Sequence, residues 1–95
     1  MYTPIAERMT PTYAHQRVYR FANDYGASVV RGLLTVGGAE GLFEVAVIRF
    51  NGANDWTLTY TTPITDDVIG RLTEDEVTEV LAKIEALPQP PRIAE

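Results

Sequence analysis

The chain has 95 residues, no cysteine and a net charge of −5, with 45% hydrophobic and 22% charged residues. This length accommodates one hydrophobic core and therefore one domain, and the composition is ordinary for a soluble globular chain. The absence of cysteine excludes a disulfide framework, a thiolate zinc site and a cysteine nucleophile.

The negative charge is concentrated toward the C-terminus. Residues 1–61 carry five acidic and five basic groups, whereas residues 62–87 carry seven acidic groups against Arg71 and Lys83. Nucleic-acid binding through the phosphate backbone needs a basic surface that neutralises phosphates. Direct nucleic-acid binding is therefore not expected.

The N-terminal sequence MYTPIAERMT lacks the basic and apolar regions of a secretory signal. No apolar run approaches the length of about 20 residues that a membrane span needs. We therefore expect a cytosolic protein without a membrane segment.

The two ends of the chain have no clear periodicity. Residues 1–14 contain two prolines and scattered threonines, and we expect a flexible N-terminal arm there. Residues 88–95, PQPPRIAE, form a proline-rich tail that cannot extend a helix. A single domain is therefore expected over residues 15–87.

Four segments with β-strand patterns follow the arm, at residues 16–22, 27–34, 42–50 and 56–61. They are separated by the turn signal NDYG, by a glycine-rich stretch, and by NGAND, whose Asn-Gly pair is typical of hairpins. In the last segment apolar residues alternate with threonines, as in a half-buried strand. Because such short connections favour antiparallel pairing, the sequence predicts a four-stranded antiparallel meander.

A helix follows, and a capping box marks its N-terminus. Thr73 is the predicted N-cap, and Glu76 lies three residues further on. Apolar residues recur at helical spacing from Val77 to Leu87, and Pro88 ends the helix. The predicted fold class is therefore α+β, with a four-stranded antiparallel β-meander and one C-terminal α-helix packed on one face.

The segment TPITDDVIG holds the only two adjacent aspartates, Asp66 and Asp67. Thr65 is a suitable N-cap, the aspartates suit a first helical turn, and Gly70 suits a left-handed C-cap. A one-turn helix is therefore the favoured interpretation. A divalent metal needs more oxygen ligands than two diverging neighbours, and acid–base work needs carboxylates that converge on a substrate. The pair is kept as a candidate binding site without a metal.

No other motif indicates chemistry. His15 is the only histidine, and a lone histidine at the start of a strand is usually an ordinary surface residue. The stretch GGAEG, residues 37–41, lacks the lysine and the following helix of a phosphate loop, and we interpret it as a strand connection with positive φ. The sequence therefore predicts no catalytic residue, no metal and no cofactor, and hence no enzyme.

The third predicted strand, residues 42–50, is apolar on both faces, so one helix leaves a second face to cover. The N-terminal arm, a second copy in a homodimer, or a partner protein could provide this cover. The candidate binding residues have side chains that are common in interfaces or that grip phosphates. They are Arg17, Tyr19, Phe21, Arg31, Arg49, Trp56 and Tyr60, together with Asp66 and Asp67. The alternative that these aromatic residues simply form the core stays open.

Three stretches, YRFANDYGASVVRG, GGAEGLFEVAVIRF and LTYTTPITDDVIGRLTEDEVTEVLAKIEAL, resemble a group of small uncharacterised proteins encoded by phages and prophages of actinobacteria. The resemblance covers nearly the whole folded part but supplies no catalytic residue or ligand. It implies an accessory gene product made in a bacterial host cytosol. Proteins of that kind commonly bind and block host machinery, including defence systems.

The first functional hypothesis is therefore a non-enzymatic, phage-type accessory protein that binds a host or phage protein, as an inhibitor of host defence. The alternative is a dimeric protein that binds or sequesters a small ligand such as a nucleotide signal. In that case Arg17, Arg20, Arg31 and Arg49 would contact the phosphates.

Overall fold

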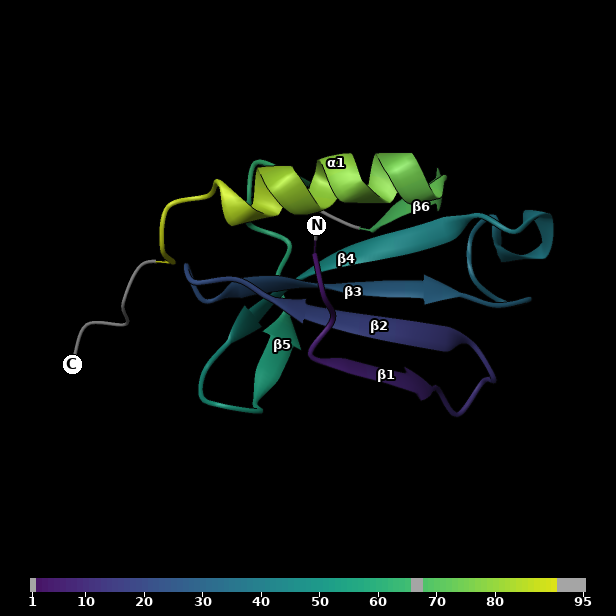
Figure 1. Ribbon diagram of the computed structural model, residues 1–95, viewed down its shortest axis with the longest axis horizontal. Helices are drawn as coiled ribbons and strands as arrows, with labels where there is room; N and C mark the ends of the chain where they lie inside the picture. Colours follow the sequence, from purple (N-terminus) through teal and green to yellow (C-terminus); the bar gives the residue numbers. More distant parts are fainter. Residues whose placement is uncertain (1, 66–67, 91–95) are drawn as a thin grey trace.

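The computed structural model describes residues 2–65 and 68–90 (Figure 1). Its elements are β1 (Ala6–Met9), β2 (His15–Arg20), β3 (Tyr25–Arg31), the 3-10 turn η1 (Gly38–Glu40), β4 (Phe43–Phe50), β5 (Trp56–Leu58), β6 (Ile69–Leu72) and α1 (Glu74–Glu85). The predicted α+β class, the antiparallel sheet and the C-terminal helix are confirmed. The predicted number of strands is too small, because the described residues form a sheet of six.

Strands β2 to β5 form the expected antiparallel meander, and two further strands extend it. The segment that was expected to be a flexible arm supplies β1, which pairs with β2 and places Ala6 opposite Val18. Strand β6 pairs with the first half of β4, whereas β5 pairs with its second half. One edge of β4 is therefore shared between two short strands.

Strand β6 begins at Ile69, where the sequence predicted the last residues of a one-turn helix. The positive φ that was expected at Gly70 occurs instead at Arg71, with φ of 59°. Gly70 lies in the strand against Val36, where an added Cβ would be 2.5 Å from Val36 Cγ1. Asp66 and Asp67 lie outside the described residues.

Helix α1 begins with the predicted capping box. The backbone N–H of Glu76 donates to Thr73 Oγ1 at 3.2 Å, and the N–H of Thr73 donates to Glu76 Oε1 at 3.0 Å. At the other end, Asn23 from the β2–β3 turn donates through its side-chain amide to the carbonyls of Ile84, Glu85 and Leu87. Both ends of the helix therefore have partners for backbone groups that the helix itself leaves unpaired.

The helix covers one face of the sheet (Figure 1). Alternate residues of β2, β3 and β4 point to this face and pack against α1. The buried residues of this core are Tyr19, Phe21, Tyr25, Ala27, Val29, Phe43, Val45, Val47, Leu72, Val77, Val80, Leu81 and Ile84. Tyr2 extends the core from the N-terminus, with its ring edge-to-face against Phe21 at 5.5 Å.

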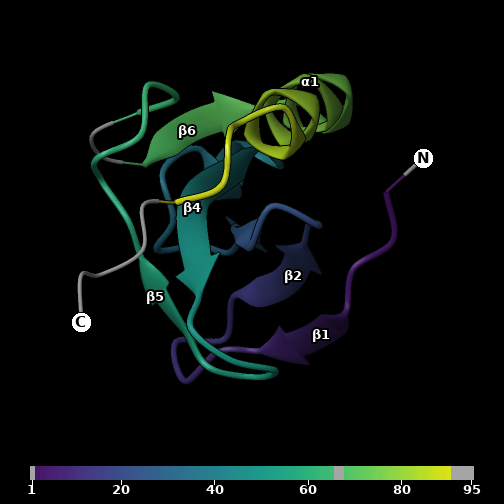
Figure 2. The same cartoon turned by 90° about the vertical axis from the view of Figure 1, so that its left-hand side faces the viewer.

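The opposite face has its own small core. Val18, Ile48 and Phe50 are buried there, with Trp56 packed against them. Figure 2 shows β1 and β5 on the side of the sheet away from α1, so the sheet curls around this second core. Arg20 supports the closure, because it lies 4.5 Å from the Phe50 ring and donates to the carbonyls of Gly52 and Ala53. A single copy of the chain thus buries the centre of the second face.

Candidate functional site

The aromatic residues proposed for binding serve mainly as core. Tyr19 and Phe21 are buried on the helix side, and Trp56 is half-buried on the opposite face. Tyr60 is the exception, with 45% of its surface exposed beyond the end of β5. The aromatic residues proposed for binding therefore do not form one surface. For Tyr19 and Phe21 the alternative holds, namely that they are part of the core.

The strand arginines separate into different places. The Cζ atoms of Arg17 and Arg31 lie 4.9 and 4.7 Å from the centre of the same Phe43 ring. Arg49 is at the far end of β4, opposite Tyr25 and Thr57. Arg20 lies on the other face, where it pairs with Asp24 at 3.1 Å. The structure therefore brings together two of the four residues that were expected to contact phosphates.

A more prominent feature is an exposed apolar tip formed by Tyr13, Leu33 and Leu34. Their exposed fractions are 82%, 83% and 80%. Isolated apolar residues are common on protein surfaces, but a cluster of large side chains that are almost fully exposed often marks an interaction site. The two loops that carry these residues, β1–β2 and β3–β4, lie at the same end of the sheet (Figure 1).

The two loops are in contact. An added Cβ on Gly32 would lie 2.8 Å from both Cα and Cβ of Ala14. Gly32 immediately precedes Leu33, and Ala14 immediately follows Tyr13. The close approach that glycine permits therefore brings the loop that carries Tyr13 against the loop that carries Leu33 and Leu34.

Local hydrogen bonds fix the β3–β4 loop. Thr35 Oγ1 accepts from the N–H of Gly32 at 2.9 Å and donates to its carbonyl at 2.8 Å. Glu44 accepts from the N–H of Val36, and Arg71 pairs with Glu40 in η1. The loop presents Leu33 and Leu34 on a held backbone, which reduces the entropy that a partner must remove on binding.

The β1–β2 turn carries backbone strain. Tyr13 has φ of 61°, in the left-handed region that glycine and asparagine occupy most easily. Hydrogen bonds of Thr10 with Tyr13 and with Ala14 close the turn. Strained backbone of this kind clusters at functional positions, and here it holds an exposed aromatic residue.

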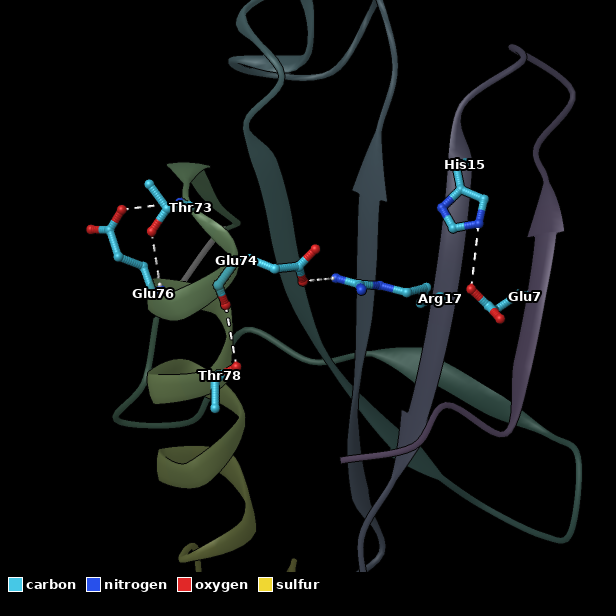
Figure 3. Close-up of polar contacts among 7 residues, drawn as sticks. All are labelled: Glu7, His15, Arg17, Thr73, Glu74, Glu76 and Thr78. Atoms are coloured by element: carbon cyan, nitrogen blue, oxygen red, sulfur yellow. Dashed lines mark hydrogen bonds and ion pairs between the residues drawn. The ribbon is translucent and has the colours of Figure 1, made fainter. Parts of the chain in front are cut away.

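The ionisable side chains beside the apolar tip mostly have partners within the chain. His15 lies 3.5 Å from Glu7, and Arg17 lies 2.7 Å from Glu74 (Figure 3). Arg31 is exposed one residue before Gly32, and the described part of the chain provides no carboxylate partner for it. Arg31 is therefore a positive charge beside the tip that a carboxylate of another protein could pair with.

Gly32 is the residue in the sequence that could have indicated this exposed tip. Leu33 and Leu34 were assigned to the strand predicted over residues 27–34, whereas β3 ends at Arg31. Gly32 marks the end of the strand, and the glycine-rich stretch that follows belongs to the same loop. The stretch GGAEG, residues 37–41, was expected to connect two strands with positive φ, and both Gly37 and Gly41 have it, at 79° and 78°.

A second feature is a groove of about 330 Å³ between β2 and α1, lined by Tyr2, Arg17, Tyr19, Glu74, Val77, Thr78 and Leu81. Burial raises the pKa of Tyr19 above its ordinary value of 10.0, against the opposing effect of the Arg17 guanidinium. The pKa of Tyr2 is also raised, first because its hydroxyl donates to Glu85. Both phenols are therefore neutral donors near neutral pH.

Within residues 2–65 and 68–90, no group of three or more His, Asp or Glu side chains is placed to hold a metal ion. The helix of this part of the chain is not long and apolar enough to cross a membrane. Comparison of the chain with protein-family models, with curated proteins and with solved structures found no match. Membership of the phage accessory group therefore stays a prediction from the sequence.

Proposed function

We propose that this chain is a non-enzymatic binding protein that docks on another protein through its apolar tip. The observation that carries the proposal is the exposure of Tyr13, Leu33 and Leu34 at about four-fifths each, on two loops in contact. Tyrosine is among the residues enriched at binding hot spots, and the two leucines add apolar area that only a partner can remove from water.

The partner that fits this surface has an apolar pocket with an acidic rim. The pocket would receive the leucines and the tyrosine, and a carboxylate on its rim would pair with Arg31. A lipid surface is a weaker match, because Glu74, Asp75 and Glu76 in the first turn of α1 would repel anionic headgroups.

The sequence resemblance makes a host or phage protein in an actinobacterial cell the first class of partner to test. Inhibition of host defence is the corresponding biological proposal. A role in nucleotide sequestration has weaker support, because Arg20 and Arg49 lie away from the pair formed by Arg17 and Arg31.

The test is affinity capture from lysate of an actinobacterial host with three forms of the tagged protein. These are the wild type, the tip variant Leu33→Ser/Leu34→Ser, and the control Leu58→Ser/Tyr60→Ser, which alters two residues of 47% and 45% exposure elsewhere. We expect a stoichiometric protein with the wild type and the control, and its loss with the tip variant.

Retention of the captured protein by the tip variant would contradict the proposal, as would the absence of any stoichiometric protein with the wild type. A captured protein is then purified, and its dissociation constant is measured for Arg31→Gln. We expect weaker binding for this variant, with a smaller dependence on salt, because an ion pair is screened by salt.

A further inference from the structure

The groove between β2 and α1 is separate from the apolar tip and has two chemically different halves. Arg17, Glu74 and Thr78 are polar, whereas Val77, Leu81 and the rings of Tyr2 and Tyr19 supply apolar walls. Figure 3 shows Arg17 extending from β2 toward the first turn of α1, where its guanidinium meets Glu74. The groove thus joins a charged site to an apolar surface.

Arg17 is more buried than its partner. Its side chain is 17% exposed, whereas that of Glu74 is 62% exposed, and one contact of 2.7 Å joins Nη2 to Oε1. Arg17 Nε is buried and has no hydrogen-bond partner among the described residues. The guanidinium of Arg17 is thus largely but not fully shielded from water, and its Nε–H donor is unfilled. It has lost hydration that a single contact with the exposed Glu74 carboxylate only partly replaces.

The ion pair that lines the groove can open for an incoming anion. Arg31 lies over the same Phe43 ring as Arg17, and Glu74 is the carboxylate that lines the groove. Glu74 is therefore the carboxylate that an incoming anion would displace from Arg17. Because Glu74 is mostly exposed, releasing it from Arg17 returns it to water at little cost.

We propose that this groove binds a small organic carboxylate, meaning one carboxylate group on an apolar body. The ligand's carboxylate would take the place of the Glu74 side chain on Arg17, whose planar guanidinium suits carboxylate oxygens. The apolar body would lie against Val77, Leu81 and the ring of Tyr19.

The dimensions of the groove limit the class of ligand. Its volume of about 330 Å³ is at the small end of ligand sites. One arginine in the lining accounts for one anionic group, which disfavours nucleotides with several phosphates. Two sources share the remaining chemistry, a free organic acid and the C-terminal residue of a peptide.

The test is a titration followed by amide chemical shifts, with N-acetylphenylalanine as the anionic probe and N-acetylphenylalanine amide as its neutral counterpart. We expect the carboxylate to bind the wild type in the millimolar range, with shifts in β2 and the first half of α1, and the amide to bind far more weakly. Equal binding of the two probes, or no binding of either, would overturn the proposal.

Two variants test the roles of the charged residues. Glu74→Gln removes the competing carboxylate and is expected to tighten binding by about threefold to fivefold, given the worth of an exposed ion pair. Arg17→Met keeps an apolar side chain on Phe43 and is expected to lose carboxylate binding. Glu79→Gln alters an exposed carboxylate of the same helix outside the groove lining and is expected to change nothing.

If Arg17→Met fails to fold, Glu74→Gln still tests the proposal. Unchanged or weaker carboxylate binding by Glu74→Gln would contradict it. A second pair of probes, 4-phenylbutyrate and N-acetyl-alanyl-phenylalanine, distinguishes the two sources. Tighter binding of the first indicates a free acid, and tighter binding of the second indicates a peptide C-terminus.

Discussion

Gly32 lies against Ala14 so closely that a methyl group on Gly32 would be 2.8 Å from the Ala14 Cα and Cβ atoms. This contact joins the turn that carries Tyr13 to the loop that carries Leu33 and Leu34. The apolar tip is therefore a product of the packing between two loops that are distant in sequence.

Gly32→Ala is expected to lower the free energy of unfolding by about 1–3 kcal/mol, as for other overpacked sites, and to weaken partner binding by separating the loops. Chemical denaturation measures the first effect. Gly52→Ala is the matched control, because its added methyl has only Asp55 Cβ within 4 Å, at 3.9 Å. Equal stability of the two variants would contradict the close packing at Gly32.

Tyr13→Asn should separate stability from binding. Asparagine tolerates the left-handed φ of 61° better than tyrosine, so we expect the free energy of unfolding to rise by about 0.5–1 kcal/mol. Partner binding should fall, because the exposed ring is lost. Thermal denaturation and the affinity measurement check the two effects, and a fall in stability would show that the tyrosine ring supports the turn.

Leu33→Ser/Leu34→Ser is expected to change the free energy of unfolding by less than about 1 kcal/mol, because both side chains are already exposed. Val45→Ala removes a side chain that is 0% exposed and should cost more, about 1–3 kcal/mol. Urea denaturation compares the variants. A large loss for the double variant would mean that the leucines contribute to folding and would weaken their assignment to binding.

Asn23 should be a strong determinant of stability. Asn23→Ala removes the donor for three carbonyls at the end of α1 and is expected to cost about 1–3 kcal/mol. Asn23→Asp should cost more, since its charge would face the negative end of the helix dipole. Denaturant titration gives the order, and Asn51→Ala in an exposed loop is the control.

The stability of the protein should fall at alkaline pH. Burial raises the pKa of Tyr19 in the folded state above 10.0, so the unfolded chain releases this proton first. The stabilisation is complete below pH 10 and is lost as pH rises through the folded pKa. Unfolding measured across this range should show a smaller alkaline loss for Tyr19→Phe, and an identical loss would contradict the assignment.

Local signals in the sequence predicted several elements of the fold. The capping box at Thr73 and Glu76 and the apolar spacing of α1 lie within one segment, and both appear as expected. Residues 42–50 were expected to be apolar on both faces, and in β4 Phe43, Val45 and Val47 pack on the helix side whereas Ile48 and Phe50 pack on the opposite side. These features depend on neighbours a few residues apart, which is the range that a sequence pattern encodes.

The tertiary structure decided the remainder. Strands β1 and β6 have four residues each and no strong alternation, so their conformation depends on pairing with β2 and β4. Three other features depend on contacts between segments that are distant in the chain. They are the closure of the second face, the position of Arg17 and Arg31 on the Phe43 ring, and the exposure of Leu33 and Leu34. A sequence determines which segments prefer strand or helix, but contacts between those segments decide which side chains are buried and which are presented to a partner.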